Sequence, residues 1–168
     1  MKPIILIGAA ERTLRDIASF DLLCDNYDSM AIGLDAIDKC EFPINYIASY
    51  HDEDFKKIKE KLKTKGFHNY KLIHHKLKDG VDIVEEHLAP SGSSALLGAV
   101  AAIRLGYTKI VLCGCPLIGI ASTKYDYALF QKGWVHREKE VKPYVKSMSG
   151  FIKEKFGEPT IEWINDGK

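Results

Sequence analysis

The sequence has few of the features that mark specialised classes of protein. Its four cysteines form no C-x-x-C pair and no spaced Cys/His set of the kind that holds zinc. No apolar run approaches the ~20 residues that a membrane-spanning helix needs. The chain opens on Met1-Lys2-Pro3 and passes directly into a strand pattern, unlike a secretory signal. We therefore expect a soluble, cytoplasmic protein with reduced thiols, no metal site and no membrane span.

An excess of charge is also absent. The chain has 24 Lys and Arg against 23 Asp and Glu, a net charge of +1. Nucleic-acid binders usually carry a basic surplus, because neutralising phosphates supplies much of their affinity. The segment 53–65 holds six lysines, but Glu53, Asp54 and Glu60 intersperse them, so we interpret it as a solvated helix face. Nucleic acid is not an expected partner.

The six histidines include no HExxH motif and no pair at helical i, i+4 spacing. Structural or solvent-facing roles are the simpler interpretation for most of them. The two best placed for chemistry are His51, just after a predicted central strand, and His136, at the start of a predicted long helix. A histidine near a phosphate-binding pocket can exchange a proton at neutral pH.

Strand patterns and helix patterns alternate along the 168 residues. Short apolar runs predict strands at 3–8, 29–34, 44–49, 70–74, 109–114 and 160–164. Helices are expected at 11–20, 52–65, 95–106 and 137–156. This alternation predicts one domain over 1–168, with a three-layer, Rossmann-like α/β fold and a mainly parallel sheet. A chain of this length buries enough apolar surface to need no metal or disulfide.

Ligands of open parallel sheets bind at the carboxyl ends of the strands, where helix N-termini present free N–H groups. The first such place is the turn Gly8-Ala9-Ala10-Glu11-Arg12, which follows the first predicted strand. It holds neither GxGxxG nor GxxxxGK[ST]. Arg12 is either a phosphate clamp or an ordinary surface arginine, and the sequence leaves both interpretations open.

The second place is Ser91-Gly92-Ser93-Ser94, which precedes a helix of small, apolar residues. One serine is enough to cap that helix. The others, with the Gly92 amide, offer donors to an anion or to the edge of a base, although plain helix capping stays open. Further along, Tyr125, Tyr127 and Trp134 either close over a base or sugar or anchor their loop to the core.

Residues 91–117, SGSSALLGAVAAIRLGYTKIVLCGCPL, resemble a signature of the bacterial CMP-sialic acid-dependent sialyltransferases. That signature is a glycine/serine turn, a small-residue helix and a strand of the form lGyk-I-yl-G-D. The related motility-accessory-factor domain family, of unknown function, shares it. The element order is similar as well, with a glycine turn at Gly8 and a D-x-x-A-I strand at 28–32. The Tyr50-His51 step is similar to one in small, uncharacterised phage-type proteins of this fold.

The resemblance implies roles for particular residues. Ser91, Gly92 and Ser93 would contact a cytidine nucleotide. Tyr125 or Tyr127 would assist the departing phosphate, and His136 would act as the general base toward an acceptor hydroxyl.

The chain departs from that family at three turns. Ala9-Ala10-Glu11-Arg12 stands in place of Asn-Gly-Pro-Ser. The family has a nucleotide-contacting asparagine on the second strand, and in this chain it is replaced by Gly33 or its neighbours. After Gly114, the family's acidic residue is replaced by Cys115-Pro116.

The sequence thus predicts a nucleotide-binding or nucleotide-sugar-binding protein, which as an enzyme would be a small glycosyltransferase. A non-catalytic binding module and a phosphosugar-binding domain, like those of sugar isomerases, are the alternatives. No resident cofactor is expected; the ligand would be a small molecule such as a cytidine nucleotide, and a homo-oligomer is left open. The expected catalytic residues are His136, Tyr125 and Tyr127. The expected ligand-binding residues are Gly8, Ala9, Ala10, Arg12, Gly33, His51, Ser91, Gly92, Ser93, Ser94 and Gly114.

Overall fold

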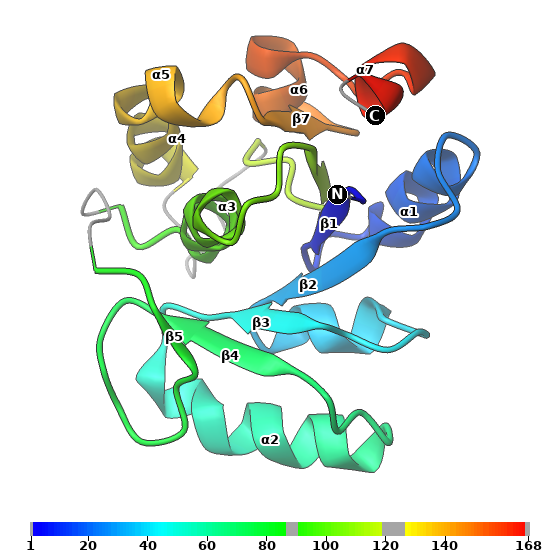
Figure 1. The fold of residues 1–168 in the computed structure, drawn as a ribbon. Coiled ribbons are helices and arrows are strands. Elements are labelled where there is room, and N and C mark those ends of the chain that lie inside the picture. Colours follow the sequence, from blue (N-terminus) through cyan, green and yellow to red (C-terminus); the bar gives the residue numbers. More distant parts are fainter. Residues whose placement is uncertain (1, 87–90, 119–126, 167–168) are drawn as a thin grey trace.

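The computed structural model describes residues 2–86, 91–118 and 127–166. Within them, parallel strands form one sheet in the order β5-β4-β3-β2-β1-β6-β7 (Figure 1). The strands are β1 (Ile4–Ile7), β2 (Asp28–Ile32), β3 (Tyr46–Ala48), β4 (Lys71–His74), β5 (Ile83–Val84), β6 (Ile110–Cys113) and β7 (Val145–Ser147). The strand order reverses at β1, which pairs with β2 on one side and β6 on the other. Such a reversal opens a crevice at the carboxyl edge of the sheet.

Helices cover both faces of this sheet. They are α1 (Thr13–Asp21), η1 (Asp35–Lys39), η2 (Asp52–Asp54), α2 (Phe55–Thr64), α3 (Ser94–Arg104), α4 (Tyr127–His136), α5 (Glu138–Val141), α6 (Gly150–Phe156) and α7 (Ile161–Asn165). One core joins α3, α4, α5 and α6 to the sheet, and a second joins α1, η1, α2 and α7 to the opposite face. The fold is therefore α/β and Rossmann-like, as predicted.

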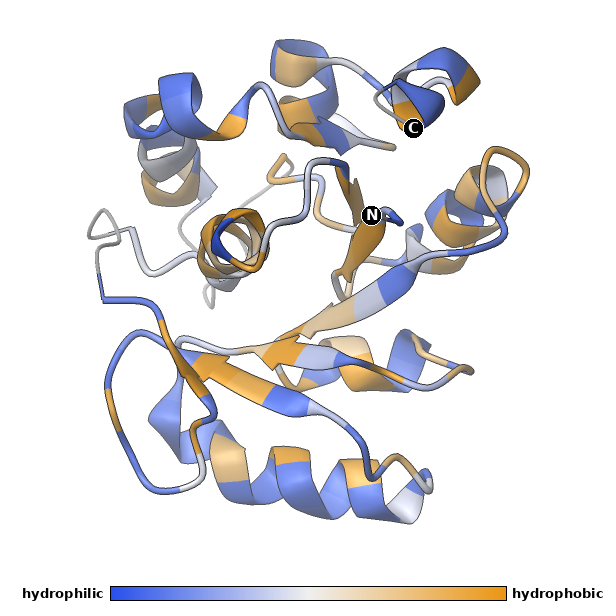
Figure 2. Cartoon of the chain, viewed as in Figure 1, coloured by the Kyte–Doolittle hydropathy of each residue, from blue (hydrophilic) through white to orange (hydrophobic). Residues whose placement is uncertain are grey.

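The central strands are apolar on both faces because both faces are covered. All residues of β1 and β6 are buried, and their sequences, IILI and IVLC, are rich in branched side chains. This composition is typical of parallel sheets. Figure 2 shows the contrast with α2, whose outer surface is hydrophilic.

The predicted helix over 137–156 is wrong. The chain there forms α5, then strand β7, then α6, and α4 begins already at Tyr127. Pro143 lacks the N–H that a helix interior requires and would cost about 3 kcal/mol there. Val145 instead pairs with Ile110 at the edge of the sheet. As a consequence, His136 ends a helix and does not open one.

The predicted last strand over 160–164 is also wrong, because this segment forms helix α7. Thr160 caps it, and its Oγ1 accepts a hydrogen bond from the Trp163 amide at 3.1 Å. Ile161 is exposed while Ile164 is buried, which is helical spacing. The sequence also gave no sign of the two-residue strand β5, which is too short to produce a hydrophobic pattern.

Candidate functional site

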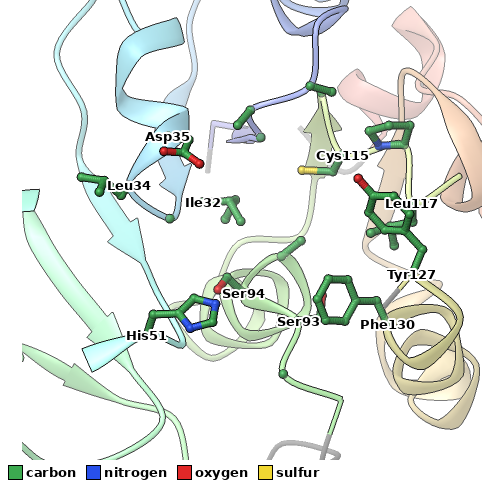
Figure 3. A pocket seen from close by; sticks show the side chains of 18 of the residues that line it. Ile32, Leu34, Asp35, His51, Ser93, Ser94, Cys115, Leu117, Tyr127 and Phe130 are labelled. Atoms are coloured by element: carbon green, nitrogen blue, oxygen red, sulfur yellow. The ribbon is translucent and has the colours of Figure 1, made fainter. Parts of the chain in front are cut away.

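A cavity of about 590 Å³ opens at the carboxyl edge of the sheet. The turns after β1, β2, β3 and β6 contribute to its wall, as do the N-terminus of α3 and one face of α4. Figure 3 shows two opposing sides with the serines of α3 between them. One side carries Cys115, Leu117, Tyr127 and Phe130; the other carries Ile32, Leu34, Asp35 and His51; between them lie Ser93 and Ser94.

The floor of the cavity is the close approach of β1 and β6. The Gly8 amide donates to the Cys113 carbonyl at 2.8 Å. A Cβ atom on Gly8 would overlap the backbone carbonyl of Gly114, so the contact requires glycine. Thr13, at the start of α1, donates its hydroxyl to the same turn, with the Ala10 carbonyl at 2.6 Å and the Gly8 carbonyl at 3.1 Å. The backbone at Gly8 is thus held in place by contacts with both β6 and α1.

The Asp16 side chain connects the chain segments that form this floor. Its side chain is 2% exposed, and its Oδ2 accepts hydrogen bonds from the Gly114 amide at 2.9 Å and the Ser149 hydroxyl at 2.6 Å. Its Oδ1 lies 3.0 Å from Arg12 Nε. Arg12 therefore has an internal partner, and it is not among the residues that line the cavity.

The turn before α3 has a different character. Ser93 caps the helix, with its Oγ accepting from the Leu96 amide at 3.2 Å. The Ser94 Oγ accepts from the Tyr50 amide at 3.0 Å and so joins α3 to the end of β3. Ser94 and Ala95 line the cavity in the first turn, where backbone N–H groups have no partner within the helix. This end of α3 presents donors and the positive end of a helix dipole.

The Ser91 side chain packs against α4 and does not line the cavity. Its side chain is 3% exposed, and it packs so closely on α4 that a Cβ at Gly133 would overlap it. The capping interpretation thus holds for Ser93, while Ser91 serves the contact between α3 and α4. Gly92, Ser93 and Ser94 are the members of this turn that reach the cavity.

Acidic side chains lie along the rim of the cavity that is formed by the turns after β2 and β3. Asp35 follows β2, while Glu53 and Asp54 belong to η2 after β3. His51 Nδ1 lies 3.5 Å from Glu53 Oε1. Among the described residues that line the cavity, no side chain is Lys or Arg. The rim therefore carries negative charge, opposite in sign to the N-terminus of α3.

Cys115 places a thiol on the cavity wall (Figure 3). Burial, and to a smaller extent the charge of Asp16, raises the pKa of this thiol to about 12. It is therefore protonated at neutral pH and acts as a small apolar group rather than as a nucleophile. Across residues 2–86, 91–118 and 127–166, no cluster of His, Cys, Asp and Glu is arranged to hold a metal ion.

An aromatic wall completes the site. Tyr127 and Phe130 project from α4, with ring centroids 6.3 Å apart in an edge-to-face arrangement. Tyr127 was predicted from sequence, whereas Tyr125 lies outside the described residues. Trp134, one turn further along, is fully buried in the core and anchors α4. Core anchoring is therefore confirmed for Trp134, whereas Tyr127 lines the cavity and its contact with a base or sugar stays a prediction.

The structure does not bring His136 to this cavity. It is exposed at the end of α4 and, with Lys132, Val135 and Phe151, lines a separate shallow depression. Tyr127, Phe130 and Trp134 share one face of α4, so a residue two positions after Trp134 falls on another face.

Most of the predicted ligand-binding residues do meet at the cavity. Those that line it are Gly8, Ala9, Ala10, Gly33, His51, Gly92, Ser93, Ser94 and Gly114. Sequence reasoning missed the acidic rim and Phe130. For Asp35 a signal was available, since an acidic residue just past a second parallel strand lies at the ligand-binding edge. Phe130 had no such signal, because its position depends on where α4 begins.

No family model matches this chain, and neither a curated protein nor a solved structure matches it. None of the helices in the described part of the chain is both long and apolar enough to cross a membrane. The geometry of the cavity therefore carries the functional argument.

Proposed function

We propose that this protein binds a nucleotide or a nucleotide sugar in the cavity at the carboxyl edge of its sheet. The observation that carries the proposal is that the turn after β1 and the serine turn of α3 line one cavity. That cavity lies where the strand order reverses. Parallel α/β folds bind their ligands at this place, and a volume near 600 Å³ is in the range of small-molecule pockets.

The chemistry of the walls supports an orientation for the ligand. A phosphate fits at the N-terminus of α3, where the amides of Ser94 and Ala95 and the Ser93 hydroxyl are donors. The rings of Tyr127 and Phe130 offer a surface for a base. Sugar hydroxyls fit the acidic rim, because carboxylates accept hydrogen bonds from them. The same serine turn resembles the sialyltransferase signature, and this resemblance favours a cytidine nucleotide as the ligand.

The proposal concerns binding and not sugar transfer. A general base must lie within about 3 Å of the proton that it takes, directly or through one water. His136 is exposed on another face of α4. His51 does line the cavity, with its Nδ1 3.5 Å from Glu53 Oε1, but the resemblance to the sialyltransferases assigns the role of base to His136 and not to His51. We therefore favour the binding module over the glycosyltransferase.

A thermal-shift series tests the proposal. The melting temperature is measured with CMP, UMP, AMP, GMP, ribose 5-phosphate and inorganic phosphate. A nucleotide at 100 times its Kd stabilises the folded state by about 2.7 kcal/mol, which raises the melting temperature by roughly 5–10 °C in a chain of this length. Cytidine nucleotides are expected to give the largest shift. Equal shifts from every phosphate would indicate a bare anion site, and a shift from ribose 5-phosphate alone would favour the phosphosugar alternative.

Two variants of α4 locate the binding. Phe130→Ala removes a ring from the cavity wall and is expected to weaken nucleotide binding by about tenfold, since stacking on an aromatic contributes about 1–3 kcal/mol per base. Val135→Ala is the matched control, because Val135 lies on the same helix but on the shallow depression. Each variant is compared with its own ligand-free melting temperature. Equal loss of binding in both variants would contradict the proposed site.

A further inference from the structure

We infer that His51, in its protonated form, is the cationic partner of the ligand's phosphate group and makes ligand binding tighter at acidic pH. The inference rests on the proposed function and deepens it, because it names the side chain that recognises the phosphate and the condition that controls binding. It follows from the charges that line the cavity, from the place of His51 beside the N-terminus of α3, and from the way its turn is built.

The charges along the cavity leave an anionic ligand poorly compensated. The described residues that line it include no Lys or Arg, and they include the carboxylates of Asp35, Glu53 and Asp54. The N-terminus of α3 supplies a positive charge of about half a unit, whereas a phosphate monoester carries a charge of about −1.5 to −2 at neutral pH. Among these lining residues, His51 has the side chain that becomes a cation, because histidine changes its charge between pH 5 and 8.

His51 lies next to the place where the phosphate is expected. The residue before it, Tyr50, donates its amide to Ser94 Oγ at 3.0 Å, in the first turn of α3. Figure 3 shows the His51 ring extending from the turn after β3 toward Ser94. Its Nδ1 lies 3.5 Å from Glu53 Oε1. Both nitrogens of a protonated ring are donors, so Nδ1–H is directed at Glu53 and Nε2–H, at the far side of the ring, is left for the ligand.

The turn that carries His51 is held on both sides of this residue. The fully buried Ser49 hydroxyl accepts a hydrogen bond from the His51 amide at 3.2 Å and donates one to the His51 carbonyl at 3.4 Å. The following residue, Asp52, places Oδ1 2.9 Å from Nε2 of the fully buried His74 and pairs through Oδ2 with Lys78. The backbone of His51 is thus set by its neighbours, while its ring, 51% exposed, borders the cavity.

Other ionisable groups surround His51, and each is a competing source of pH dependence. His74 and His75 lie behind the turn, the first paired with Asp52 and the second stacked on Tyr50 with ring centroids 4.0 Å apart. Burial lowers the pKa of His75, and neither of these two histidines lines the cavity. The ionisable residues that line the cavity together with His51 are Asp35, Glu53, Asp54, Cys115 and Tyr127. A substitution of His51 alone leaves all of these groups in place and therefore isolates its contribution.

The probes are the methyl esters of CMP, UMP, AMP and GMP, together with the corresponding nucleosides. An unmodified monophosphate changes its own charge near pH 6, whereas the methyl ester keeps a single negative charge from pH 5.5 to pH 8.0. The nucleoside lacks the phosphate, so it reports any effect of pH on the fold or on the acidic rim. Calorimetric titration of the intact chain gives the Kd of each probe at pH 5.5 and at pH 8.0.

For the ester that binds best, the Kd is expected to be about 10- to 100-fold lower at pH 5.5 than at pH 8.0, since a hydrogen bond to a charged group is gained. The matching nucleoside is expected to bind equally at both pH values. His51→Gln keeps a donor but cannot become charged, so its Kd for the ester is expected to be the same at both pH values and close to the native value at pH 8.0.

His136→Gln is the matched control. It makes the same change at an exposed histidine that lines the shallow depression and not the cavity. This variant is expected to keep the native pH dependence. Ligand-free melting temperatures at each pH confirm that both variants fold.

The failure of the inference is distinguishable from the failure of the proposed function. If nucleotides bind but the ester does not bind more tightly at pH 5.5, the inference about His51 is overturned while the proposed function stands. The same holds if His51→Gln keeps the pH dependence, if both variants lose it alike, or if the nucleoside shows the same pH dependence as its ester. If no nucleotide, ester or nucleoside binds at either pH, the proposed function itself fails and the inference fails with it.

Discussion

The two turns that meet at the cavity, Gly8–Arg12 after β1 and Ser91–Ser94 before α3, use their polar groups in different ways. In the first turn several polar groups are bonded to other parts of the protein. The Gly8 amide and carbonyl, together with Arg12, are all engaged by the β6 strand, Thr13 or Asp16. In the second turn, Ser93 caps its helix and Ser94 holds β3, yet the first-turn amides of α3 still lie along the cavity.

This difference separates a scaffold from a binding surface. A polar group with buried internal partners stabilises the fold, because leaving any partner unsatisfied costs free energy. A helix N-terminus at a cavity keeps donors for an external acceptor. We therefore expect substitutions at the floor to reduce stability and substitutions at α3 to reduce binding. Four predictions test this division, from the largest expected effect to the smallest.

Asp16→Ala is expected to reduce the free energy of unfolding by about 3–5 kcal/mol, because it removes a buried charged partner from the Gly114 amide, the Ser149 hydroxyl and Arg12. Urea denaturation followed by circular dichroism measures the loss. Glu11→Ala is the control, since Glu11 is exposed in the same region, and it is expected to stay within about 0.5 kcal/mol of the native chain. Equal stability of the two variants would show that the floor does not depend on Asp16.

Gly8→Ala is expected to cost about 3 kcal/mol, because its Cβ meets the backbone of Gly114, which cannot move without disturbing β6. The matched control is Gly66→Ala. Gly66 has open space around it but a φ of +75°, so its cost of about 1–2 kcal/mol is purely conformational. A combined Gly8→Ala and Cys115→Ala variant, which removes the other close neighbour, is expected to remain destabilised. Full recovery would place the constraint on the thiol and not on the backbone.

The Cys115 thiol predicts a loss of stability in alkali. Its folded-state pKa of about 12 lies above the value near 9 that it has when exposed. The unfolded chain therefore loses this proton first. The stability that the protonated thiol contributes to the folded state is fully present below pH 9 and is lost as the pH rises from 9 to 12. At pH 10 the expected loss from this one group is roughly 1–2 kcal/mol relative to pH 7.

The measurement is the difference in unfolding free energy between pH 7 and pH 10, for the native chain and for Cys115→Ala. The variant is expected to lose roughly 1–2 kcal/mol less than the native chain over this range. Cys24→Ala serves as the control, because Cys24 is only half-buried, outside the cavity. If Cys115→Ala shows the same pH dependence as the native chain, the thiol is not shielded by the floor as described.

The sequence predicted the parts of the fold that depend on local pattern. The apolar runs that became β1 and β6 could be recognised without tertiary information, and so could the serine turn before α3. Thr160–Ile164 was misjudged because branched residues favour a strand in isolation, whereas here Thr160 caps a helix and Ile164 packs on the core. Residues 137–156 form α5, β7 and α6 in place of the predicted single helix because β7 pairs with β6. A local sequence pattern contains no information on such pairing.

The candidate site was predictable where it follows from the strand ends. Gly8 and Gly114 had to meet at one edge once the sheet was parallel. The acidic rim is a property of two separate turns, and its combined charge becomes visible only when β2 and β3 lie side by side. The position of His136 depended on the start of α4, and an error of about ten residues there moved it from the cavity to the outer surface.

The smallest expected effect on stability comes from Ser93→Ala, which removes the cap of α3. The Leu96 amide loses its partner, so the free energy of unfolding is expected to fall by about 1 kcal/mol. Thr160→Ala is a matched control, because the Thr160 hydroxyl caps α7 through the Trp163 amide at 3.1 Å, in a helix that does not border the cavity. Urea denaturation is expected to show similar losses for the two variants.

Nucleotide affinity then separates the two caps. If the N-terminus of α3 holds the phosphate, Ser93→Ala removes a hydroxyl from the cavity wall and loosens the first-turn amides, so the Kd for CMP is expected to rise by about five- to tenfold. Thr160→Ala lowers stability by a similar amount but leaves the cavity intact, so its Kd for CMP is expected to equal that of the native chain. If both variants bind CMP as the native chain does, Ser93 serves only as a helix cap, and the phosphate lies elsewhere in the cavity.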